Sequence, residues 1–355
     1  MKEKNEIDFA SGLTCPIPKN DYDRVLLAHG GGGTLSHQLI SKMFFSHFDN
    51  DLLNEQHDSA IFNIEKGKLA FTTDSYVVQP IFFPGGDIGE LAVYGTVNDL
   101  TAAGAKPKFI SVGFIIEEGF LMEELWQVVQ SIKRAADNAG VIIATGDTKV
   151  VDKGNGDKIF INTSGIGIIS EKINISPKNC KAGDKIILSG RIADHGITIM
   201  AARERLEFDT TINSDTAPLN GLFETIEHFG EKIHMMRDPT RGGIASTLNE
   251  IAETANVGIF IEEEKIPING EVDAACEILG LDPLYIANEG KMIFIVSEDS
   301  ADEILLTIRS HELGKEAEII GTVTEEDSGI VIMKTTIGSK RVVDMISGEQ
   351  LPRIC

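Results

Sequence analysis

The chain has 355 residues, a hydrophobic content of 42% and a formal net charge of −23. This length is enough for about two domains, and the composition favours a folded core over a disordered chain. The strongly acidic balance argues against nucleic acid as a partner, because such a surface repels phosphate backbones.

The chain begins with the charged residues 1–6, which lack the apolar stretch of a signal peptide. The longest apolar runs, such as 109–116, are far too short to span a bilayer. The four cysteines, at positions 15, 180, 276 and 355, show no C-x-x-C spacing, which argues against a zinc site or a disulfide framework. The sequence therefore predicts a cytoplasmic protein with no membrane anchor, in which Cys355 stays a thiol.

A glycine-rich loop with Gly31, Gly32 and Gly33 lies between a predicted short strand (24–28) and a predicted helix (36–48). Such a loop can let consecutive N–H groups point at one anion. The alternative interpretation is a flexible connector. The loop is neither a P-loop, because no Gly-Lys-Ser/Thr follows, nor a dinucleotide-binding loop, because leucine occupies the last glycine position.

The rest of the chain alternates predicted strands with predicted helices. In the first half, strands are predicted at 60–64, 68–73, 109–116, 141–144 and 158–169, helices at 91–105 and 121–139, and a turn-rich loop at 82–89. After a boundary at 170–183, strands are predicted at 185–188, 257–261, 292–296, 317–323 and 329–334, and helices at 196–205, 217–229, 244–255, 269–279 and 301–312. This alternation indicates an α/β fold.

Four aspartates stand at the ends of predicted elements beside threonine, asparagine or glycine: Asp74, Asp99, Asp147 and Asp238. Each alone is typical of a helix cap or a turn. Asp99 is the only charge in the predicted helix 91–105, and a buried lone carboxylate is costly unless it is paired or binds a metal. Together with the glycine loop and Lys149, the four carboxylates suggest a Mg–ATP site outside the P-loop and dinucleotide-binding families.

The last residues of the sequence carry a thiol at Cys355. Gly348 provides a pivot, and Pro352 favours extended backbone before it. From the pivot to the thiol an extended segment spans roughly 25 Å, which allows Cys355 to enter a pocket on its own body or on another protein. A frayed tail with an incidental cysteine is the alternative.

Several motifs in order resemble the HypE family of hydrogenase maturation proteins over nearly the whole chain. The motifs are Thr72-Thr73-Asp74-Ser75, Phe82-Phe83-Pro84-Gly85-Gly86-Asp87-Ile88-Gly89, Gly95-Thr96-Val97-Asn98-Asp99-Leu100, Thr145-Gly146-Asp147-Thr148-Lys149-Val150-Val151, Arg237-Asp238-Pro239-Thr240-Arg241-Gly242-Gly243, Asn288-Glu289-Gly290-Lys291 and Pro352-Arg353-Ile354-Cys355. More remotely the chain is similar to the aminoimidazole ribonucleotide synthetase superfamily, which includes selenophosphate synthetase and thiamine-monophosphate kinase. Those relatives lack the Pro-Arg-Ile-Cys ending.

The resemblance implies a two-domain PurM-like α/β fold and a homodimer with a sheet across the dimer. It predicts an ATP-binding and dimerisation domain at 1–170, a second α/β domain at 171–345, and a mobile tail at 346–355. ATP would lie in the groove between the domains, with Mg²⁺ as cofactor.

The resemblance also implies site residues. The nucleotide site would include Gly31, Gly32, Gly33, Asp74, Asp87, Asp99, Asp147 and Asp238; the magnesium ligands would be Asp74, Asp99 and Asp238; and the catalytic residues would be Cys355, Lys149 and Glu289. Lys149 or Glu289 would act as the base.

The activity that the resemblance implies is a carbamoyl dehydratase. HypF would carbamoylate Cys355, ATP would drive dehydration of the S-carbamoyl group to thiocyanate, and the HypC–HypD complex would accept the cyanide for hydrogenase iron. Two other hypotheses stay open at this point. One is a superfamily enzyme that phosphorylates a free small molecule, and the other is a carrier whose thiol shuttles a group made elsewhere.

Overall fold

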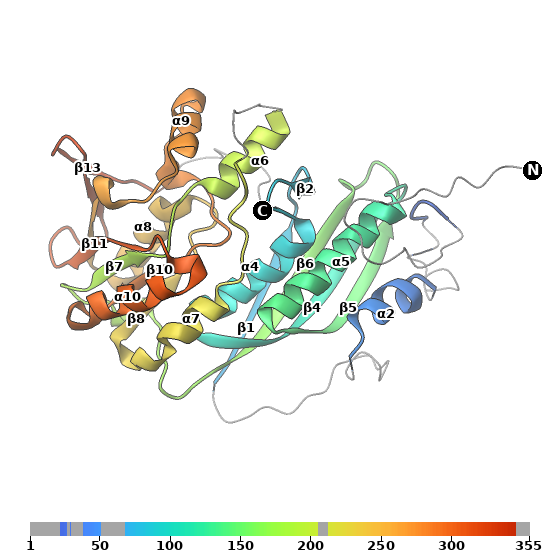
Figure 1. The fold of residues 1–355 in the computed structure, drawn as a ribbon, viewed down its shortest axis with the longest axis horizontal. Coiled ribbons are helices and arrows are strands. Elements are labelled where there is room, and N and C mark those ends of the chain that lie inside the picture. The colour runs from blue at the N-terminus through green and yellow to red at the C-terminus, as the bar shows by residue number, and fades with distance from the viewer. Residues whose placement is uncertain (1–21, 27–28, 30–37, 51–67, 205–211, 346–355) are drawn as a thin grey trace, which may run out of the picture.

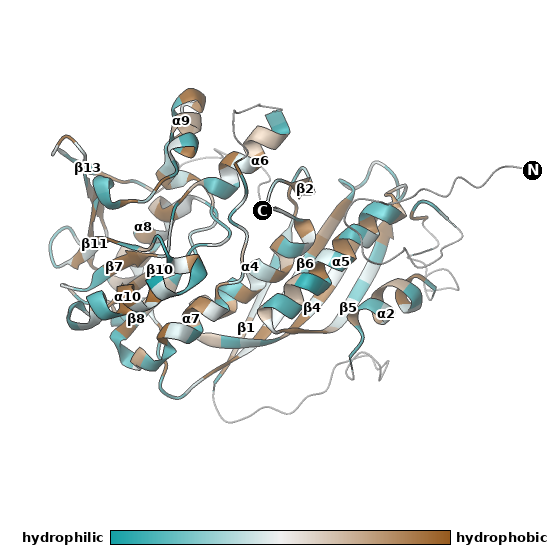
Figure 2. Cartoon of the chain, in the orientation of Figure 1, coloured by the Kyte–Doolittle hydropathy of each residue, from teal (hydrophilic) through white to brown (hydrophobic). Residues whose placement is uncertain are grey.

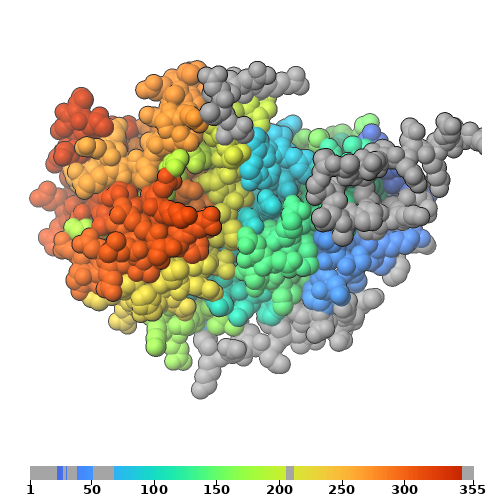
Figure 3. Space-filling model, viewed as in Figure 1, coloured from blue at the N-terminus to red at the C-terminus, as the bar shows by residue number. Residues whose placement is uncertain are grey.

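The computed structural model describes residues 22–26, 29, 38–50, 68–204 and 212–345. In these ranges two α/β halves lie side by side, each with its own sheet and helices (Figure 1). In the space-filling view, the cyan and green surface of the N-terminal half borders the yellow surface of the C-terminal half, and the orange and red surface lies beyond it (Figure 3). Across the described ranges, no helix has the length and apolar character needed to cross a bilayer.

The N-terminal half is built on a four-stranded sheet with the order β1-β6-β4-β5. Its elements are η2 (Ile40–Phe45), α2 (Ser46–Phe48), β1 (Lys68–Tyr76), β2 (Phe82–Phe83), β3 (Gly86–Asp87), α4 (Ile88–Ala102), β4 (Ala105–Glu117), α5 (Met122–Ala139), β5 (Ile142–Val151) and β6 (Ile159–Ile169). Strands β4 and β5 run parallel, and the other neighbouring pairs in this sheet are antiparallel.

Helices α4 and α5 cover one face of this sheet (Figure 1). In α5, Leu125, Val128, Val129 and Ile132 recur at helical spacing and are fully buried. Nearly every residue of α4 is buried, because the sheet, α5 and the C-terminal half all pack against this helix.

The opposite face of the sheet is apolar and exposed in the described part of the chain. One row of paired positions crosses all four strands, from Phe71 through Ile166 and Phe109 to Ile142. Phe71 is 70% exposed and Ile142 is 41% exposed. The hydropathy colouring shows brown segments on these strands (Figure 2). This face of the sheet is therefore a candidate interaction surface.

The C-terminal half contains a seven-stranded sheet with the order β13-β12-β9-β11-β7-β10-β8. Its elements are β7 (Lys185–Leu188), α6 (Asp194–Glu204), α7 (Asn220–Ile226), β8 (Ile233–Arg237), α8 (Gly243–Ala255), β9 (Gly258–Glu262), α9 (Gly270–Leu279), β10 (Ile293–Val296), α10 (Ala301–Ser310), β11 (Glu318–Thr324), β12 (Val331–Lys334) and β13 (Lys340–Val342). Short 3₁₀ turns lie at η3 (Pro177–Asn179), η4 (Glu227–Lys232), η5 (Glu263–Lys265), η6 (Pro283–Tyr285), η7 (Glu298–Ser300) and η8 (Glu312–Gly314).

Both faces of this second sheet are covered, and the strands alternate between two cores accordingly. In β10, Ile293 and Ile295 pack in the core that includes α8, whereas Phe294 and Val296 pack in the core that includes α7 and α10. A strand that is buried on both faces has a continuous run of apolar residues in its sequence. For this reason β7 and β10 could be predicted from the sequence.

Most predicted elements are confirmed within one to three residues at each end, and several predictions are wrong. The region 24–28 forms an isolated bridge at Arg24 in its described part, not a strand. The predicted loop 82–89 contains the β2–β3 hairpin, and α4 begins at Ile88 instead of 91. Strand β5 runs to Val151, so the Thr145–Lys149 motif lies inside a strand. The strands β8 and β13 were missed, and the predicted strand 60–64 lies outside the described residues.

Candidate functional site

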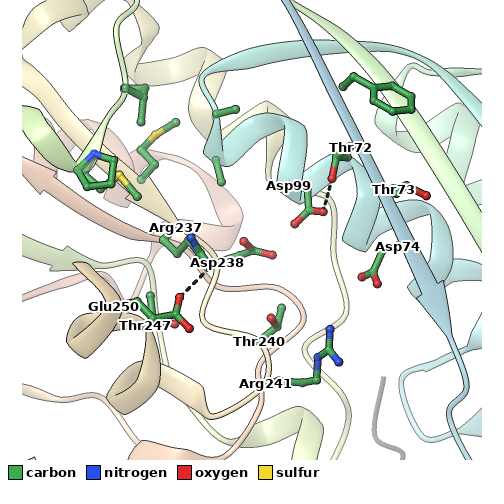
Figure 4. Close-up of a pocket in the computed structure, with 17 residues that line it drawn as sticks. Thr72, Thr73, Asp74, Asp99, Arg237, Asp238, Thr240, Arg241, Thr247 and Glu250 are labelled. Atoms are coloured by element: carbon green, nitrogen blue, oxygen red, sulfur yellow. Dashed lines mark hydrogen bonds and ion pairs between the residues drawn. The ribbon is translucent and has the colours of Figure 1, made fainter. Parts of the chain in front are cut away.

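A cleft of about 530 Å³ lies between the two halves and gathers the candidate site residues (Figure 4). Its walls come from β1, the C-terminal end of α4, the segment 175–177, the end of β8 with the loop that follows, and the middle of α8. Asp74, Asp99 and Asp238, predicted from sequence positions far apart, all line this one cleft. A cleft of this size is typical of small-molecule sites.

The packing of α4 on β1 brings Asp99 to the cleft. A Cβ atom at Gly95 would lie 2.2 Å from the hydroxyl of Tyr76 in β1, so only glycine lets the helix approach so closely. One turn later the Thr72 hydroxyl donates a hydrogen bond of 2.9 Å to the Asp99 carboxylate. Asp74 lies two residues further along the same strand, which places both carboxylates on one wall.

The opposite wall is formed by the Arg237–Gly243 motif between β8 and α8. Asp238 follows the last residue of β8 and is buried. Arg237 donates a hydrogen bond of 2.8 Å to Glu250 of α8. Arg241 lies below Asp74 in the close-up (Figure 4). The cleft therefore contains two guanidinium groups as well as four carboxylates, those of Asp74, Asp99, Asp238 and Glu250. Guanidinium groups suit the recognition of phosphate.

Burial and neighbouring charges shift the pKa values of the carboxylates in the cleft. Burial, followed by the charge of Asp99, raises the pKa of Asp238 to about 7. Burial also raises the pKa of Asp99, with Asp74 acting in the same direction, whereas the hydrogen bond from Thr72 lowers it. The positive charge of Arg237 acts against both increases in pKa but is smaller than the effect of burial. Crowded carboxylates of this kind are stabilised by a bound cation.

No three His, Cys, Asp or Glu side chains in the described ranges converge closely enough to form a complete metal site by themselves. Asp74, Asp99 and Asp238 share the cleft without forming such a cluster, so their role as metal ligands stays a prediction. This spacing is compatible with Mg²⁺, which usually takes one or two protein carboxylates and completes its shell with water and substrate phosphates.

Asn98, next to Asp99 on α4, forms hydrogen bonds between the two halves. Its amide oxygen accepts a hydrogen bond of 2.8 Å from the Leu219 N–H, and its amide nitrogen donates to the carbonyls of Ala217, at 3.0 Å, and Glu289, at 3.3 Å. The helix that carries Asp99 is thereby coupled to the loop that carries Glu289.

Glu289 is buried and is not among the residues that line the cleft, and its Oε1 atom has no hydrogen-bond partner among the described residues. Burial, followed by the charge of Asp215 and then of Asp238, raises the pKa of Glu289 well above its ordinary value. The adjacent backbone is firmly held, because Asp215 accepts hydrogen bonds from the N–H groups of Glu289 and Gly290 and forms an ion pair of 3.0 Å with Lys291.

Asp147 and Lys149 do not reach this cleft within one chain. They lie on β5, an edge strand separated from β1 by β6 and β4. Three strand spacings amount to about 14 Å. The two side chains form an exposed ion pair of 3.1 Å with each other. The expectation that Asp147 lies close to Asp74, Asp99 and Asp238 is wrong for a single chain.

Asp87 also has a different place from the one expected. Its Oδ1 atom caps α4 by accepting hydrogen bonds from the N–H groups of Gly89, at 2.7 Å, and Glu90, at 3.2 Å, and from the hydroxyl of Ser131, at 2.5 Å. The side chain is buried and does not line the cleft. Its assignment to the nucleotide site is therefore not supported by the geometry, whereas helix capping accounts for its contacts.

Other predicted residues lie outside the described ranges: Gly31, Gly32, Gly33 and Cys355. In contrast, Arg237 and Arg241 line the cleft but were not predicted as site residues. The sequence contained a usable signal for them, because both arginines flank Asp238 in one short motif.

The two halves match two domain families. Residues 56–169 match the N-terminal domain of AIR synthase related proteins, and residues 181–334 match the C-terminal domain. These matches agree with the two-domain PurM-like fold expected from the sequence.

Individual relatives are similar over nearly the full length. The carbamoyl dehydratase HypE of Rhizobium leguminosarum bv. viciae is 49% identical over 353 residues, which cover 99% of this chain and 98% of the relative. A crystal structure of hydrogenase maturation protein HypE in complex with ATP is 48% identical, with a TM-score of 0.90, and the match covers 93% of this chain and 99% of that one. The HypE chain of a HypE–HypF complex is 52% identical, with a TM-score of 0.77 and coverage of 87% and 99%.

Proposed function

The chain belongs to the HypE family of carbamoyl dehydratases, and from this premise we propose that it uses ATP to dehydrate an S-carbamoyl group on Cys355 to S-cyanide. The cyanide becomes a ligand for the iron of NiFe hydrogenase. The observation that carries the proposal is the cleft between the halves, where carboxylate and guanidinium groups face one space large enough for a nucleotide. A relative 48% identical to this chain was crystallised with ATP.

Magnesium fits the donor set of the cleft, because the charge of Asp99 raises the pKa of Asp238, the charge of Asp74 raises the pKa of Asp99, and a divalent cation would relieve this repulsion. We assign the metal to Asp74, Asp99 and Asp238, together with the phosphates. When bound, magnesium supplies charge neutralisation during phosphoryl transfer. Arg237 and Arg241 donate hydrogen bonds to the phosphate oxygens.

The chemistry requires the carbamoyl oxygen to leave, and oxide or hydroxide is a poor leaving group. The carbamoyl oxygen of S-carbamoyl-Cys355 attacks the γ-phosphorus of ATP, and ADP departs. The amide nitrogen then loses both protons while the carbon–oxygen bond breaks. The oxygen leaves in inorganic phosphate, and a carbon–nitrogen triple bond remains on the sulfur. The cleft residues contribute orientation and charge stabilisation to the phosphoryl transfer.

The protons of the amide nitrogen need an acceptor. Glu289 has a pKa well above its ordinary value because of burial, so its rare carboxylate form is a strong base, and its unpartnered Oε1 atom is free to accept a proton. Lys149 lies three strands from β1 in its own chain. We therefore propose that any action of Lys149 on the cleft comes from the second chain of a dimer.

A homodimer is supported by the exposed apolar face of the N-terminal sheet, where Phe71 is 70% exposed and Leu69 is 51% exposed. Pairing two such faces would remove this surface from water. Asp147 and Lys149 lie on β5 of the same sheet, so the dimer is the assembly in which they approach a partner chain.

HypF is proposed as the carbamoyl donor, because a relative 52% identical to this chain was crystallised with HypF. The HypC–HypD complex is proposed as the cyanide acceptor, and the cytoplasm as the compartment.

The experiment that tests the function follows the mass of the C-terminal peptide during incubation with carbamoyl donor, HypF and Mg–ATP. We expect first the S-carbamoyl and then the S-cyano form of Cys355, with release of ADP. ATP turnover that persists in a Cys355→Ala variant would instead indicate phosphorylation of a small molecule. Cyanation in the absence of nucleotide would indicate a carrier.

A further inference from the structure

Asp215 is a buried carboxylate that does not line the cleft. Its side chain is 3% exposed. Its Oδ1 atom accepts a hydrogen bond of 3.1 Å from the Glu289 N–H, and its Oδ2 atom accepts one of 3.2 Å from the Gly290 N–H. The two oxygens of one carboxylate therefore bind two consecutive peptide groups, and such charge-assisted hydrogen bonds are stronger than neutral ones.

The segments that carry Asp215 and Glu289 are in close contact. A Cβ on Gly290 would lie 1.8 Å from the Asp215 carbonyl oxygen, so only glycine fits at this position. The Glu289 carbonyl accepts hydrogen bonds from the Asn98 amide at 3.3 Å and from the Ala217 N–H at 3.4 Å. Both polar groups of the Glu289 backbone are thus bound, and its Cα has little freedom to move.

The Glu289 carboxyl is bound differently from the backbone that carries it. It is buried, and its Oε1 atom has no hydrogen-bond partner in the described part of the chain. A buried polar atom without a partner costs free energy, so it calls for an explanation, and proton transfer supplies one. A carboxyl that turns about its own side-chain bonds on a fixed backbone suits a proton acceptor, whose position must be held to within about 0.5 Å.

Asp215 is held in its ionised form by a counter-ion. The Nζ atom of Lys291 lies 3.0 Å from Oδ2 of Asp215, and the lysine side chain is 13% exposed. Burial acts to raise the pKa of Asp215, but the charges of Lys291 and His195 and the hydrogen bond from Glu289 outweigh it, so the pKa lies below its ordinary value. Asp194 is a further neighbour, because burial and then the charge of Asp215 raise the pKa of Asp194 to about 6. A negative charge is therefore present beside Glu289 at neutral pH.

The charge of Asp215 acts on the Glu289 carboxyl. Burial, followed by the charge of Asp215, raises the pKa of Glu289 well above its ordinary value. The other titratable groups that interact with this carboxyl are Asp238, Asp74, Asp99 and Tyr76. The three aspartates in this set line the cleft, where a cation would offset their charge. Within this set, Asp215 is therefore the acidic neighbour whose influence on Glu289 persists when the cleft is filled.

We propose that Asp215 is a positioning residue for the dehydration: its two carboxylate oxygens fix the Glu289–Gly290 backbone, so that the Glu289 carboxyl takes protons from a fixed position with only its side chain free to move. Lys291 assists as the counter-ion that keeps Asp215 charged. This inference rests on the proposed function, because it assumes that Glu289 accepts the protons of the amide nitrogen. It adds a residue outside the cleft that acts on the reaction through Glu289.

Single-turnover conversion tests the positioning role. S-carbamoylated protein, separated from HypF, is mixed with saturating Mg–ATP, and the mass of the C-terminal peptide is followed over time. Asp215→Asn should slow the step from S-carbamoyl to S-cyano by about ten- to a hundredfold, since a displacement near 1 Å can cost about 10²-fold. Its Mg–ATP affinity in calorimetry should equal that of wild type. Conversion at the wild-type rate, or a loss of Mg–ATP affinity that accounts for the slower rate, would overturn the proposal.

Asp282→Asn is the matched control. Asp282 also accepts a backbone hydrogen bond, of 3.0 Å from the Leu284 N–H, and also forms an ion pair, of 2.7 Å with Arg341. These contacts do not involve Glu289, so this variant should convert at the wild-type rate. An equally slow control would show that the loss of any such carboxylate slows the step, which would reject a specific role for Asp215.

A second variant covers the case in which Asp215→Asn fails to fold because Lys291 is left without its partner. Asp215→Asn combined with Lys291→Met removes both charges of the pair, and replacing a buried ion pair as a whole is much less destabilising than removing one partner. We expect the same slow conversion and the same Mg–ATP affinity. A wild-type rate in the folded double variant would contradict the positioning role.

Infrared spectroscopy tests the link to Glu289 without turnover. The spectrum of wild type minus that of Glu289→Gln isolates the band of the protonated Glu289 carboxyl, and the loss of this band with rising pH gives a midpoint in nucleotide-free protein. The same difference taken in the Asp215→Asn background should have a midpoint at least about one pH unit lower, because a like charge has been removed from beside the carboxyl. A contact that only supports the fold would not move this midpoint, so an unchanged value would refute the inference.

The two measurements separate this inference from the proposed function. If wild-type protein never forms S-cyano-Cys355, the proposed function is wrong, and the infrared midpoint still decides whether Asp215 acts on Glu289. If S-cyano-Cys355 forms and Asp215→Asn converts at the wild-type rate, the function stands and Asp215 is not a positioning residue.

Discussion

Asp238→Asn tests the electrostatics of the cleft directly. Burial, followed by the charge of Asp99, raises the pKa of Asp238 from 3.8 to about 7. A carboxyl whose pKa is raised in the native state binds its proton more tightly there than in the unfolded chain. Stability is therefore greatest at low pH and falls as the pH rises from the unfolded pKa through the native one. At pH 8 the ionised Asp238 opposes folding.

The magnitude follows from the shift. Each pKa unit corresponds to about 1.4 kcal/mol, so a shift of about 3 units gives ~4 kcal/mol as an upper limit. Asparagine has nearly the same shape and no charge. Between pH 5.5 and pH 8, about 1.5 units of the shift are expressed, so the stability advantage of the variant over wild type should grow by about 2 kcal/mol.

Urea unfolding of nucleotide-free protein in a chelator, at pH 5.5 and pH 8, measures this difference. Asp302→Asn, at an exposed position of α10, is the control and should show no such change with pH. The same Asp238→Asn variant should bind Mg–ATP at least about tenfold more weakly in calorimetry, since it removes a charge from the proposed metal site. A stability gap that does not change with pH would refute the assignment of the raised pKa to Asp238.

Three further predictions address the rest of the site. Asp74→Asn and Asp99→Asn should each weaken Mg–ATP binding in calorimetry without unfolding the protein; unchanged affinity in both would reject their metal role. Phe71→Glu should shift the assembly to the 38.5 kDa monomer in light scattering, because it places charge on the exposed apolar face; a wild-type monomer at micromolar concentration would reject the dimer. Lys149→Ala should slow the step from S-carbamoyl to S-cyano by ten- to a hundredfold, as for a general base, and a wild-type rate in this single-turnover assay would remove Lys149 from the chemistry.

The local sequence determined elements whose signal lies within one segment. Helix α5 was predicted from the spacing of Leu125, Val128 and Ile132, because one face of a single helix needs only residues a few positions apart. Strands β7 and β10 were predicted because both of their faces are buried, which makes them continuous apolar runs. The aspartates of the cleft were found because carboxylates at element ends next to glycine and threonine form a local pattern.

Only the tertiary structure decided which of these residues meet. Strand β8 was missed because His234 and Arg237 interrupt its apolar pattern, and it is defined by pairing with β10 far along the chain. Asp87 and Asp99 look alike in the sequence, yet one caps a helix and the other faces the cleft.

The family motifs predicted that Asp147 and Lys149 matter, but the order of the strands places them on the edge opposite β1. Local patterns follow from the geometry of one helix or strand, whereas a site assembled from β1, α4 and β8 depends on pairings between distant segments. Those pairings are set by the packing of the whole chain, and no window of the sequence contains them.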